Sequence, residues 1–137
     1  MRRSRNGYYR NRHSCFLLQY HLVLVTKYRR KVITGDIEEA LKGYTEKYFS
    51  DRKFRVLALE TMPDHIHILF EFHPQESVAS FVNAFKTGSS RYIRKCFAKE
   101  LRQYYWKPCF WSPSYFIGSV SENTTDTVKK YIDNQKG

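Results

Sequence analysis

The segment HIHILFEF at residues 65–72 begins with apolar and polar side chains in strict alternation, as a β-strand with two different faces does. The residues expected to face a core are Ile66, Ile68, Phe70 and Phe72. His65 and His67 would share the opposite face, with their Cα atoms ~6.6 Å apart. At this spacing both imidazoles can reach one metal ion. Two exposed histidines on an edge strand would give the same pattern, so both interpretations are open at this point.

Elements of alternating type surround this strand. Runs of apolar and β-branched residues predict strands at residues 16–28, 54–61 and 65–72, and one or two extended pieces within residues 104–120. Apolar residues at helical spacing predict helices at residues 36–49 and 78–93, the second of them long and amphipathic. A short last helix is expected at residues 123–135.

The order β-α-β-β-α-β, followed by a terminal helix, predicts an α+β fold. It is the order of a ferredoxin-like split β-α-β antiparallel sheet with helices on one face and the other face open to a ligand. The chain has 137 residues, which suits one compact domain, because two domains of half that length would each bury too small a core. We therefore expect a single domain over residues 1–137, with a flexible basic arm at residues 1–13.

The charge of the chain is high and unevenly placed. Lys and Arg number 24 against 13 Asp and Glu, a net charge of +11, and nine of these cations precede the first carboxylate, Asp36. Aromatic residues make up 17% of the chain. Cations neutralise phosphates and rings stack on unpaired bases, so the combination favours a single-stranded nucleic acid as partner. A basic protein with half-buried tyrosines is the alternative. The candidate phosphate contacts are Lys27, Arg29, Arg30, Lys86, Arg91 and Arg94.

Several classes of protein are disfavoured by composition. No apolar run approaches the roughly 20 residues of a membrane span. The basic residues 1–13 lack an apolar segment of the secretory type. The three cysteines are widely spaced and form neither a disulfide framework nor a zinc pattern. We expect a cytoplasmic protein with no membrane partner.

The predicted last helix carries a second pair of functional candidates. Tyr131 and Gln135 are four residues apart, so they lie on one helix face, one turn apart. A phenol can act as a nucleophile, and an amide oxygen can complete a metal site. In the alternative interpretation, Tyr131 packs beside Val128 while Gln135 faces water.

Five segments, taken in order, resemble one family, the HUH single-tyrosine transposases of small bacterial and archaeal insertion sequences. They are YHLVLVTKYRRK at residues 20–31, MPDHIH at 62–67, FKTGSSR at 85–91, WSPSYF at 111–116 and YIDNQ at 131–135. The resemblance covers nearly the whole chain.

The resemblance implies a substrate, a metal site and a nucleophile. The substrate would be single-stranded DNA with short hairpins near the element ends. His65, His67 and Gln135 would hold a divalent ion, Mg²⁺ or Mn²⁺. Tyr131 would attack the scissile phosphate and form a 5′-phosphotyrosine intermediate, with no nucleotide cofactor. Two classes compete with this expectation. One is a non-catalytic single-stranded nucleic-acid-binding domain. The other is a related HUH nicking enzyme or a domesticated transposase that processes chromosomal repeats.

The resemblance also implies a homodimer in which the tyrosine helix of one subunit reaches the histidine strand of the other. The strand predicted at residues 16–28 is apolar and carries no charge before Lys27, so we expect an exposed edge that a second copy covers by pairing.

Two residues near the histidine strand are expected to have structural roles. Asp64 follows a proline and is expected to cap a turn, with binding a metal or supporting a ligand as the alternatives. His21 lies among apolar neighbours and is expected to be structural.

Overall fold

The computed structural model describes residues 2–3, 9–10, 15–16, 18–73, 76–120 and 131–134. Near the N-terminus, β1 (Arg2–Arg3), β2 (Tyr9–Arg10) and β3 (Cys15–Phe16) pair as a three-stranded antiparallel sheet in the order β1-β2-β3. The other residues of the arm predicted at residues 1–13 lie outside the described part of the chain. So does most of the helix predicted at residues 123–135, of which the four described residues, 131–134, are helical.

A four-stranded antiparallel sheet forms the body of the molecule. Its strands are β4 (Gln19–Val25), β5 (Val56–Met62), β6 (His65–Glu71) and β7 (Phe116–Ser119), in the order β5-β6-β4-β7. All three pairings are antiparallel. This is the strand order of the predicted ferredoxin-like split β-α-β sheet, so the predicted fold is confirmed.

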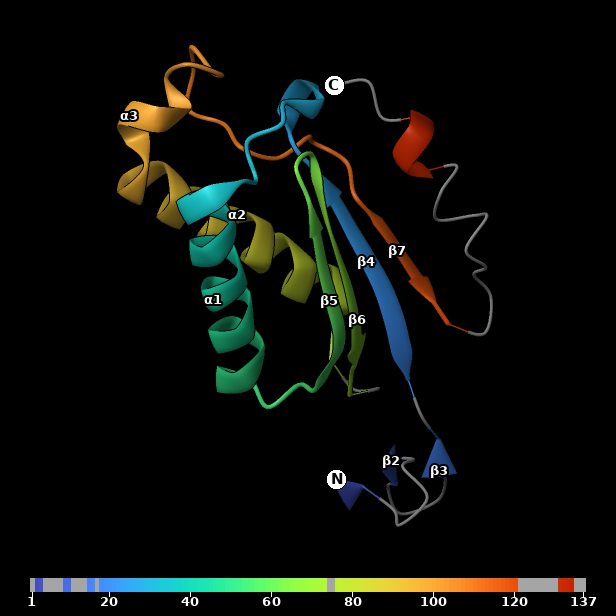
Figure 1. The fold of residues 1–137 in the computed structure, drawn as a ribbon. Helices are drawn as coiled ribbons and strands as arrows, with labels where there is room; N and C mark the ends of the chain where they lie inside the picture. The colour runs from blue at the N-terminus through green and yellow to red at the C-terminus, as the bar shows by residue number, and fades with distance from the viewer. Residues whose placement is uncertain are drawn as a thin grey trace.

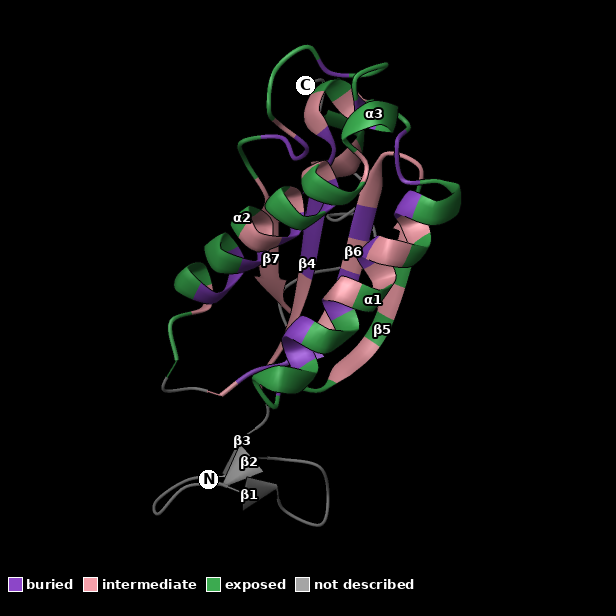
Figure 2. Cartoon of the chain, turned by 90° about the vertical axis from the view of Figure 1, so that its left-hand side faces the viewer, coloured by how far each residue is buried: buried purple, intermediate pink, exposed green. Residues whose placement is uncertain are grey.

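Helices cover one face of this sheet. They are α1 (Gly35–Asp51), α2 (Val78–Cys96) and the one-turn α3 (Ala98–Leu101), and a 3-10 helix, η1 (Lys27–Arg29), follows β4. Figure 1 shows α1 and α2 on the same side of the sheet, and Figure 2 shows that their outer faces are exposed while the faces toward the sheet are buried.

Aromatic rings fill the layer between helices and sheet. Phe70 of β6, fully buried, packs its ring 5.1 Å from that of Phe49 in α1 and 5.8 Å from that of Phe81 in α2. The fully buried strand residues on this face include Leu22, Leu24, Ile66 and Ile68. The alternation that predicted a core face for residues 65–72 is therefore confirmed.

The two helices approach closely at one glycine. Gly88 lies in the middle of α2, where an added Cβ would collide with the Tyr44 hydroxyl of α1. The helix continues through this point to Cys96, three residues beyond its predicted end. Its first turn is capped by Ser77, whose hydroxyl accepts a 3.2 Å hydrogen bond from the Ser80 N–H. None of the described helices is long and apolar enough to cross a membrane.

The expectation of an exposed edge at residues 16–28 is wrong. β4 lies in the interior of the sheet, with β6 on one side and β7 on the other, so both its edges are paired within the chain. The strand also ends at Val25, because the next residue closes a turn: Thr26 Oγ1 donates a 2.7 Å hydrogen bond to the carbonyl of Arg30. Its long apolar run reflects burial on both faces rather than a surface awaiting a second copy.

Candidate active site

The histidines of β6 lie on the face of the sheet opposite the helices. His65 and His67 are half-buried, whereas Ile66 between them is fully buried in the core. In the register with β4, His65 pairs with Val25 and His67 with Val23. Cross-strand partners share a face, so the two histidines and the two valines form one surface.

Asp64 connects the histidines to a basic segment. Its Oδ1 lies 2.9 Å from His65 Nδ1, and its Oδ2 accepts hydrogen bonds from Arg29 Nε at 3.0 Å and Nη2 at 2.9 Å. Burial by itself would raise the pKa of Asp64, but hydrogen bonds from His65 and Arg29, with the Arg29 charge, hold that pKa below its usual value. The turn-capping role favoured by the sequence is therefore not the one its side chain has.

This contact fixes the tautomer of His65. An ionised carboxylate can only accept hydrogen bonds, so Nδ1 of His65 must carry the proton. The lone pair of the imidazole is then on Nε2, which is the arrangement that orients a histidine for metal binding. Asp64 therefore orients the His65 ring, which is the arrangement expected if its side chain supports a ligand, one of the alternatives that the sequence left open.

The basic segment after β4 reaches Asp64 through an unusual backbone. Tyr28 (φ 59°) and Arg29 (φ 52°) are consecutive non-glycine residues in the left-handed region. That conformation costs an L-residue roughly 1–2 kcal/mol. The two residues turn the chain back over the end of the sheet, where the Arg29 guanidinium meets Asp64. Such strain often accompanies functional sites.

His21 is a member of the site that the sequence analysis missed. Its Nδ1 lies 2.8 Å from His67 Nε2, and the two ring centroids are 5.0 Å apart. The structural role expected for His21 stays a prediction, and the structure adds that its side chain contacts His67. Burial lowers the pKa of His67, and the neighbouring His21 lowers it further. His67 is therefore neutral at neutral pH, as a metal-binding imidazole must be.

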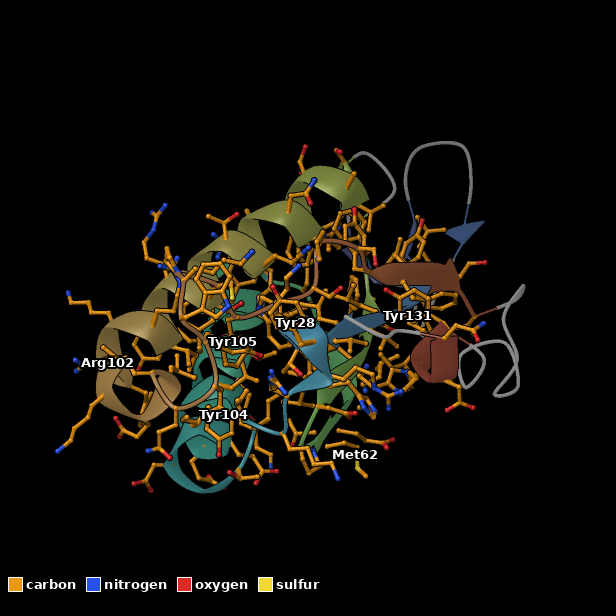
Figure 3. The ribbon with its side chains drawn as sticks, turned by 90° about the horizontal axis from the view of Figure 1, so that it is seen from above. Tyr28, Met62, Arg102, Tyr104, Tyr105 and Tyr131 are labelled. Atoms are coloured by element: carbon orange, nitrogen blue, oxygen red, sulfur yellow. The ribbon has the colours of Figure 1, made fainter. Side chains whose placement is uncertain are left out.

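Tyr131 lies on the same open face. Tyr131 and Ile132 pack against Val23 and Val25, and the Tyr131 ring lies 5.4 Å from that of Phe116 in β7. The short helical turn of residues 131–134 is on the side of the sheet away from α1 and α2 (Figure 1), and Figure 3 shows Tyr131 beside the strands from above. Tyr131 thus packs on Val23 and Val25, which are the strand partners of His67 and His65.

The Tyr131 hydroxyl is held in an environment that opposes ionisation. Burial raises its pKa, and Ser114, whose Oγ is 3.5 Å away, offsets part of this effect. Gln135 and Val128, which entered the two sequence interpretations of this helix, lie outside the described residues.

Known proteins resemble this chain over most of its length. Residues 14–135 match the family described as "Transposase IS200 like". The chain belongs to this family.

Relatives of this transposase are similar over most of their length. This chain is 36% identical over 120 residues to the ISDra2 transposase TnpA of Deinococcus radiodurans. The alignment spans 88% of this chain and 85% of that protein. The chain is 32% identical over 123 residues to the transposase for insertion sequence element IS200 of Salmonella typhimurium, spanning 90% of this chain and 80% of that one.

Two solved structures share the fold of this transposase. The crystal structure of a Deinococcus radiodurans R1 protein assigned as a transposase aligns with a TM-score of 0.84 and 34% identity, over 94% of this chain and 98% of that chain. A REP-associated tyrosine transposase bound to a REP hairpin aligns with a TM-score of 0.56 and 16% identity, over 97% and 69%. At that identity the second match shows a common fold alone.

The predicted phosphate contacts of this transposase occupy different environments. Lys27 and Arg30 flank the Tyr28 ring, at 4.9 and 5.8 Å from its centroid. Arg29 pairs with Asp64, as described above. Lys27 and Arg29 of η1, and Arg30 directly after it, therefore lie at the histidine end of the sheet.

The other three predicted contacts come from α2. Arg91 is exposed, and Arg94 Nε donates a 3.1 Å hydrogen bond to Ser90 Oγ. Lys86 Nζ donates to the carbonyls of Ser112 and Pro113, at 3.0 and 2.8 Å, and burial lowers its pKa. Lys86 therefore anchors the loop before β7, a role the sequence did not predict.

Among the residues the structure describes, no three His, Cys, Asp or Glu side chains gather as a metal-binding cluster. The donors present are the two imidazoles of His65 and His67 on one strand face, the first oriented by Asp64. They fit a divalent ion that takes further ligands from elsewhere, such as Gln135 or a DNA phosphate.

Proposed function

We propose that this transposase cleaves and rejoins single-stranded DNA at the hairpin-bearing ends of an insertion sequence, with Tyr131 as nucleophile. The observation that carries the proposal is the packing of Tyr131 on Val23 and Val25, the strand partners of His67 and His65. A phenol and a pair of metal-binding imidazoles thus share one open face, next to cations suited to phosphate.

The chemistry follows from the nucleophile. Attack of Tyr131 Oη on the scissile phosphorus would form a phosphotyrosine ester with the 5′ end of one fragment. The phenol loses its proton, and the departing O3′ takes one up to become a free 3′-OH. In the reverse sense, a 3′-OH attacks the phosphotyrosine, releases the phenol and restores a phosphodiester. The high-energy bond is conserved in the ester, so no nucleotide cofactor is required.

Residues of this chain prepare the site for that step. The raised pKa of Tyr131 means that an acceptor must take its proton as the new bond forms. Asp64 keeps Nε2 of His65 available, and burial keeps His67 neutral. We assign His65, His67 and Gln135 as the ligands of Mg²⁺ or Mn²⁺. The bound ion would polarise the scissile phosphate and offset its developing charge.

Charge and a structural neighbour support the substrate. A net charge of +11 favours a polyanion, and Lys27 and Arg29 of η1, with Arg30 after it, contribute three cations at the histidine end of the sheet. The REP-associated tyrosine transposase that shares this fold was solved with a REP hairpin. A hairpin beside an unpaired strand is therefore the DNA form that we assign to this transposase.

A covalent adduct is the direct test. We expect DNA from the genomic flanks of the element to become attached to the protein with Mn²⁺ and not with EDTA. A strand labelled at its 3′ end should carry the label onto the protein in a denaturing gel, whereas a 5′ label should leave on a fragment ending in 3′-OH. Tyr131→Phe should bind the strand and form no adduct. Tyr104→Phe, an exposed tyrosine elsewhere, is the matched control and should react normally. DNA binding without any adduct would indicate the non-catalytic alternative.

The quaternary arrangement has its own test. The resemblance implies a homodimer with sites formed in trans, whereas the contact of Tyr131 with Val23 and Val25 supports a site completed within one chain. Mixing Tyr131→Phe with His67→Ala protein distinguishes the two. Sites formed in trans would regain a fraction of wild-type activity after subunit exchange, and sites within one chain would stay inactive. Light scattering on the same sample gives the oligomeric state.

A further inference from the structure

A concave surface lies away from the histidines, where the end of α2 meets α3 and the loop after it. It is a cavity of about 290 Å³. The lining residues that matter here are Arg94, Arg102, Tyr105, Trp106, Lys107 and Cys109. Its volume is near the lower limit for small-molecule pockets, so it suits one ring system rather than a large ligand.

Trp106 is the unusual feature of this cavity. Its side chain is 84% exposed, whereas the chain's other tryptophan, Trp111, is 7% exposed. The loop that carries Trp106 is not a loose tip: the preceding Tyr105 is buried, and its hydroxyl donates a 2.8 Å hydrogen bond to the carbonyl of Lys27. The loop is anchored beside Trp106, and a large ring with most of its surface in water is available to stack on a flat partner.

The polar lining of the cavity carries one sign of charge. Arg94, Arg102 and Lys107 are cations, and no carboxylate is among the residues that line it. Lys107 Nζ lies 5.3 Å from the Trp106 ring centroid. Burial raises the pKa of Cys109, which keeps that thiol neutral. A ring flanked by cations matches a nucleotide, which presents a flat base and an anionic phosphate together.

A ring contact links the cavity lining to the segment beside the candidate active site. The Tyr105 ring lies 6.4 Å from that of Tyr28, and Tyr28 precedes Arg29, the residue paired with Asp64. Figure 3 shows Arg102, Tyr105, Tyr28 and Tyr131 in this order across the top of the molecule. A strand with its scissile phosphate at the histidines would therefore pass the exposed Tyr28 on its way to the cavity.

We propose that this cavity binds one unpaired nucleotide of the DNA substrate, at a distance from the cleaved phosphate. The base stacks on Trp106, and Arg94, Arg102 and Lys107 bind the adjoining phosphates. The proposal rests on the proposed function, since it takes the same single strand as ligand. It adds a specificity element: the protein would sense whether a base is present at one defined position outside the scissile step.

The test combines an abasic scan of the strand with variants of Trp106. Binding is measured in EDTA, so that no cleavage occurs, with single-stranded oligonucleotides that lack the base at one position at a time. For wild-type protein, one position should weaken binding by about 5- to 150-fold, the range of one base–aromatic stack. Trp106→Ala should lose a similar factor on the intact strand, and removing the base at that position should then cost nothing more.

Matched variants separate stacking from other effects. Trp106→Phe keeps a ring and should retain most of the affinity and the sensitivity to the same abasic position. Arg102→Ala should reduce the dependence of affinity on salt, whereas Lys99→Ala, which removes a cation of α3 outside the cavity lining, should change it less.

The outcomes distinguish this proposal from the proposed function. If adduct formation proceeds while Trp106→Ala binds every abasic strand as wild type does, the cavity is not a nucleotide site, although the proposed function stands. If Trp106→Ala changes only the oligomeric state, the surface is an interface between copies and the proposal is wrong. If wild-type protein binds no single strand and forms no adduct, both fail together.

Discussion

The two faces of the central sheet are built from the same strands and differ in what holds them together. On the helix-covered face, β6 contributes Ile66, Ile68 and Phe70, all fully buried among aromatic rings of α1 and α2. On the open face, the same strand contributes His65 and His67, whose partners are polar or lie at the surface. Packing determines the first face, whereas the second combines directed hydrogen bonds with a smaller apolar cluster around Val23 and Val25. Because side chains alternate along a strand, the residues of β6 that stabilise the core and the two histidines of the candidate site lie on opposite faces.

Substitutions on the core face of β6 should therefore reduce stability, whereas substitutions on its histidine face should reduce cleavage. Phe70→Ala removes a fully buried ring that packs against Phe49 and Phe81. We expect a loss of about 3–5 kcal/mol in the free energy of unfolding, from the lost burial and the cavity left behind. Urea denaturation followed by circular dichroism measures it. A loss below about 1 kcal/mol would show that the helix-covered face is not the stabilising one.

His67→Ala should act on cleavage and leave the fold in place. Loss of groups that only support a metal ligand costs about 10–100-fold, so loss of a ligand should reduce adduct formation by at least about 100-fold. Stability should change by about 1 kcal/mol, the value of one hydrogen bond, here that with His21. His73→Ala is the matched control, since His73 packs on Phe54 away from the site and its loss should leave adduct formation unchanged. Unaltered cleavage by His67→Ala would remove the histidine pair from the mechanism.

Gly88→Ala tests the packing of α1 on α2 behind the core face. The new methyl group would meet the Tyr44 hydroxyl, and overpacking of this kind costs about 1–3 kcal/mol. Tyr44→Phe removes the colliding oxygen, and the nearest remaining atom would be 3.4 Å from the new Cβ, an ordinary contact. The double variant should therefore recover most of the stability. If Gly88→Ala is as stable as wild type in thermal unfolding, the close approach of the helices is not tight.

Asp64→Asn should have the smallest effect on stability, and the effect should depend on pH. The pKa of Asp64 is lowered in the folded state, so its stabilising contribution is present above the ordinary value of 3.8 and is lost as pH falls through the folded value. The variant should be less stable than wild type at neutral pH, and the difference should vanish in acid. Unfolding curves from pH 7 down to pH 2 measure this, and a constant difference over that range would contradict it.

The sequence predicted the parts of this molecule that depend on local pattern. The period of residues 65–72 placed His65 and His67 on the face away from the core, and helical spacing placed α1 and α2 to within a few residues. The ferredoxin-like order followed from the sequence of elements. Each of these features depends on residues that are close together in the chain.

What the sequence did not predict depends on pairing between distant segments. His21 alternates with Val23 and Val25 on β4, but only the register with β6 brings it to His67. Asp64 shows its role only because a left-handed turn at residues 28–29 aims Arg29 at it. The position of Tyr131 over β4 also depends on contacts made across the fold.

The interior position of β4 has a consequence for how the chain folds. Its pairing with β7 joins Val23 to Phe116, residues at nearly opposite ends of the sequence. Contacts between such distant residues are slow to form, because a long loop must close before they stabilise anything. During synthesis, one edge of β4 stays unpaired until residues 116–119 emerge, and an unpaired apolar edge is prone to aggregation. Tyr131 follows shortly after β7, so the nascent chain acquires the proposed nucleophile only after the strand that closes the sheet has been made.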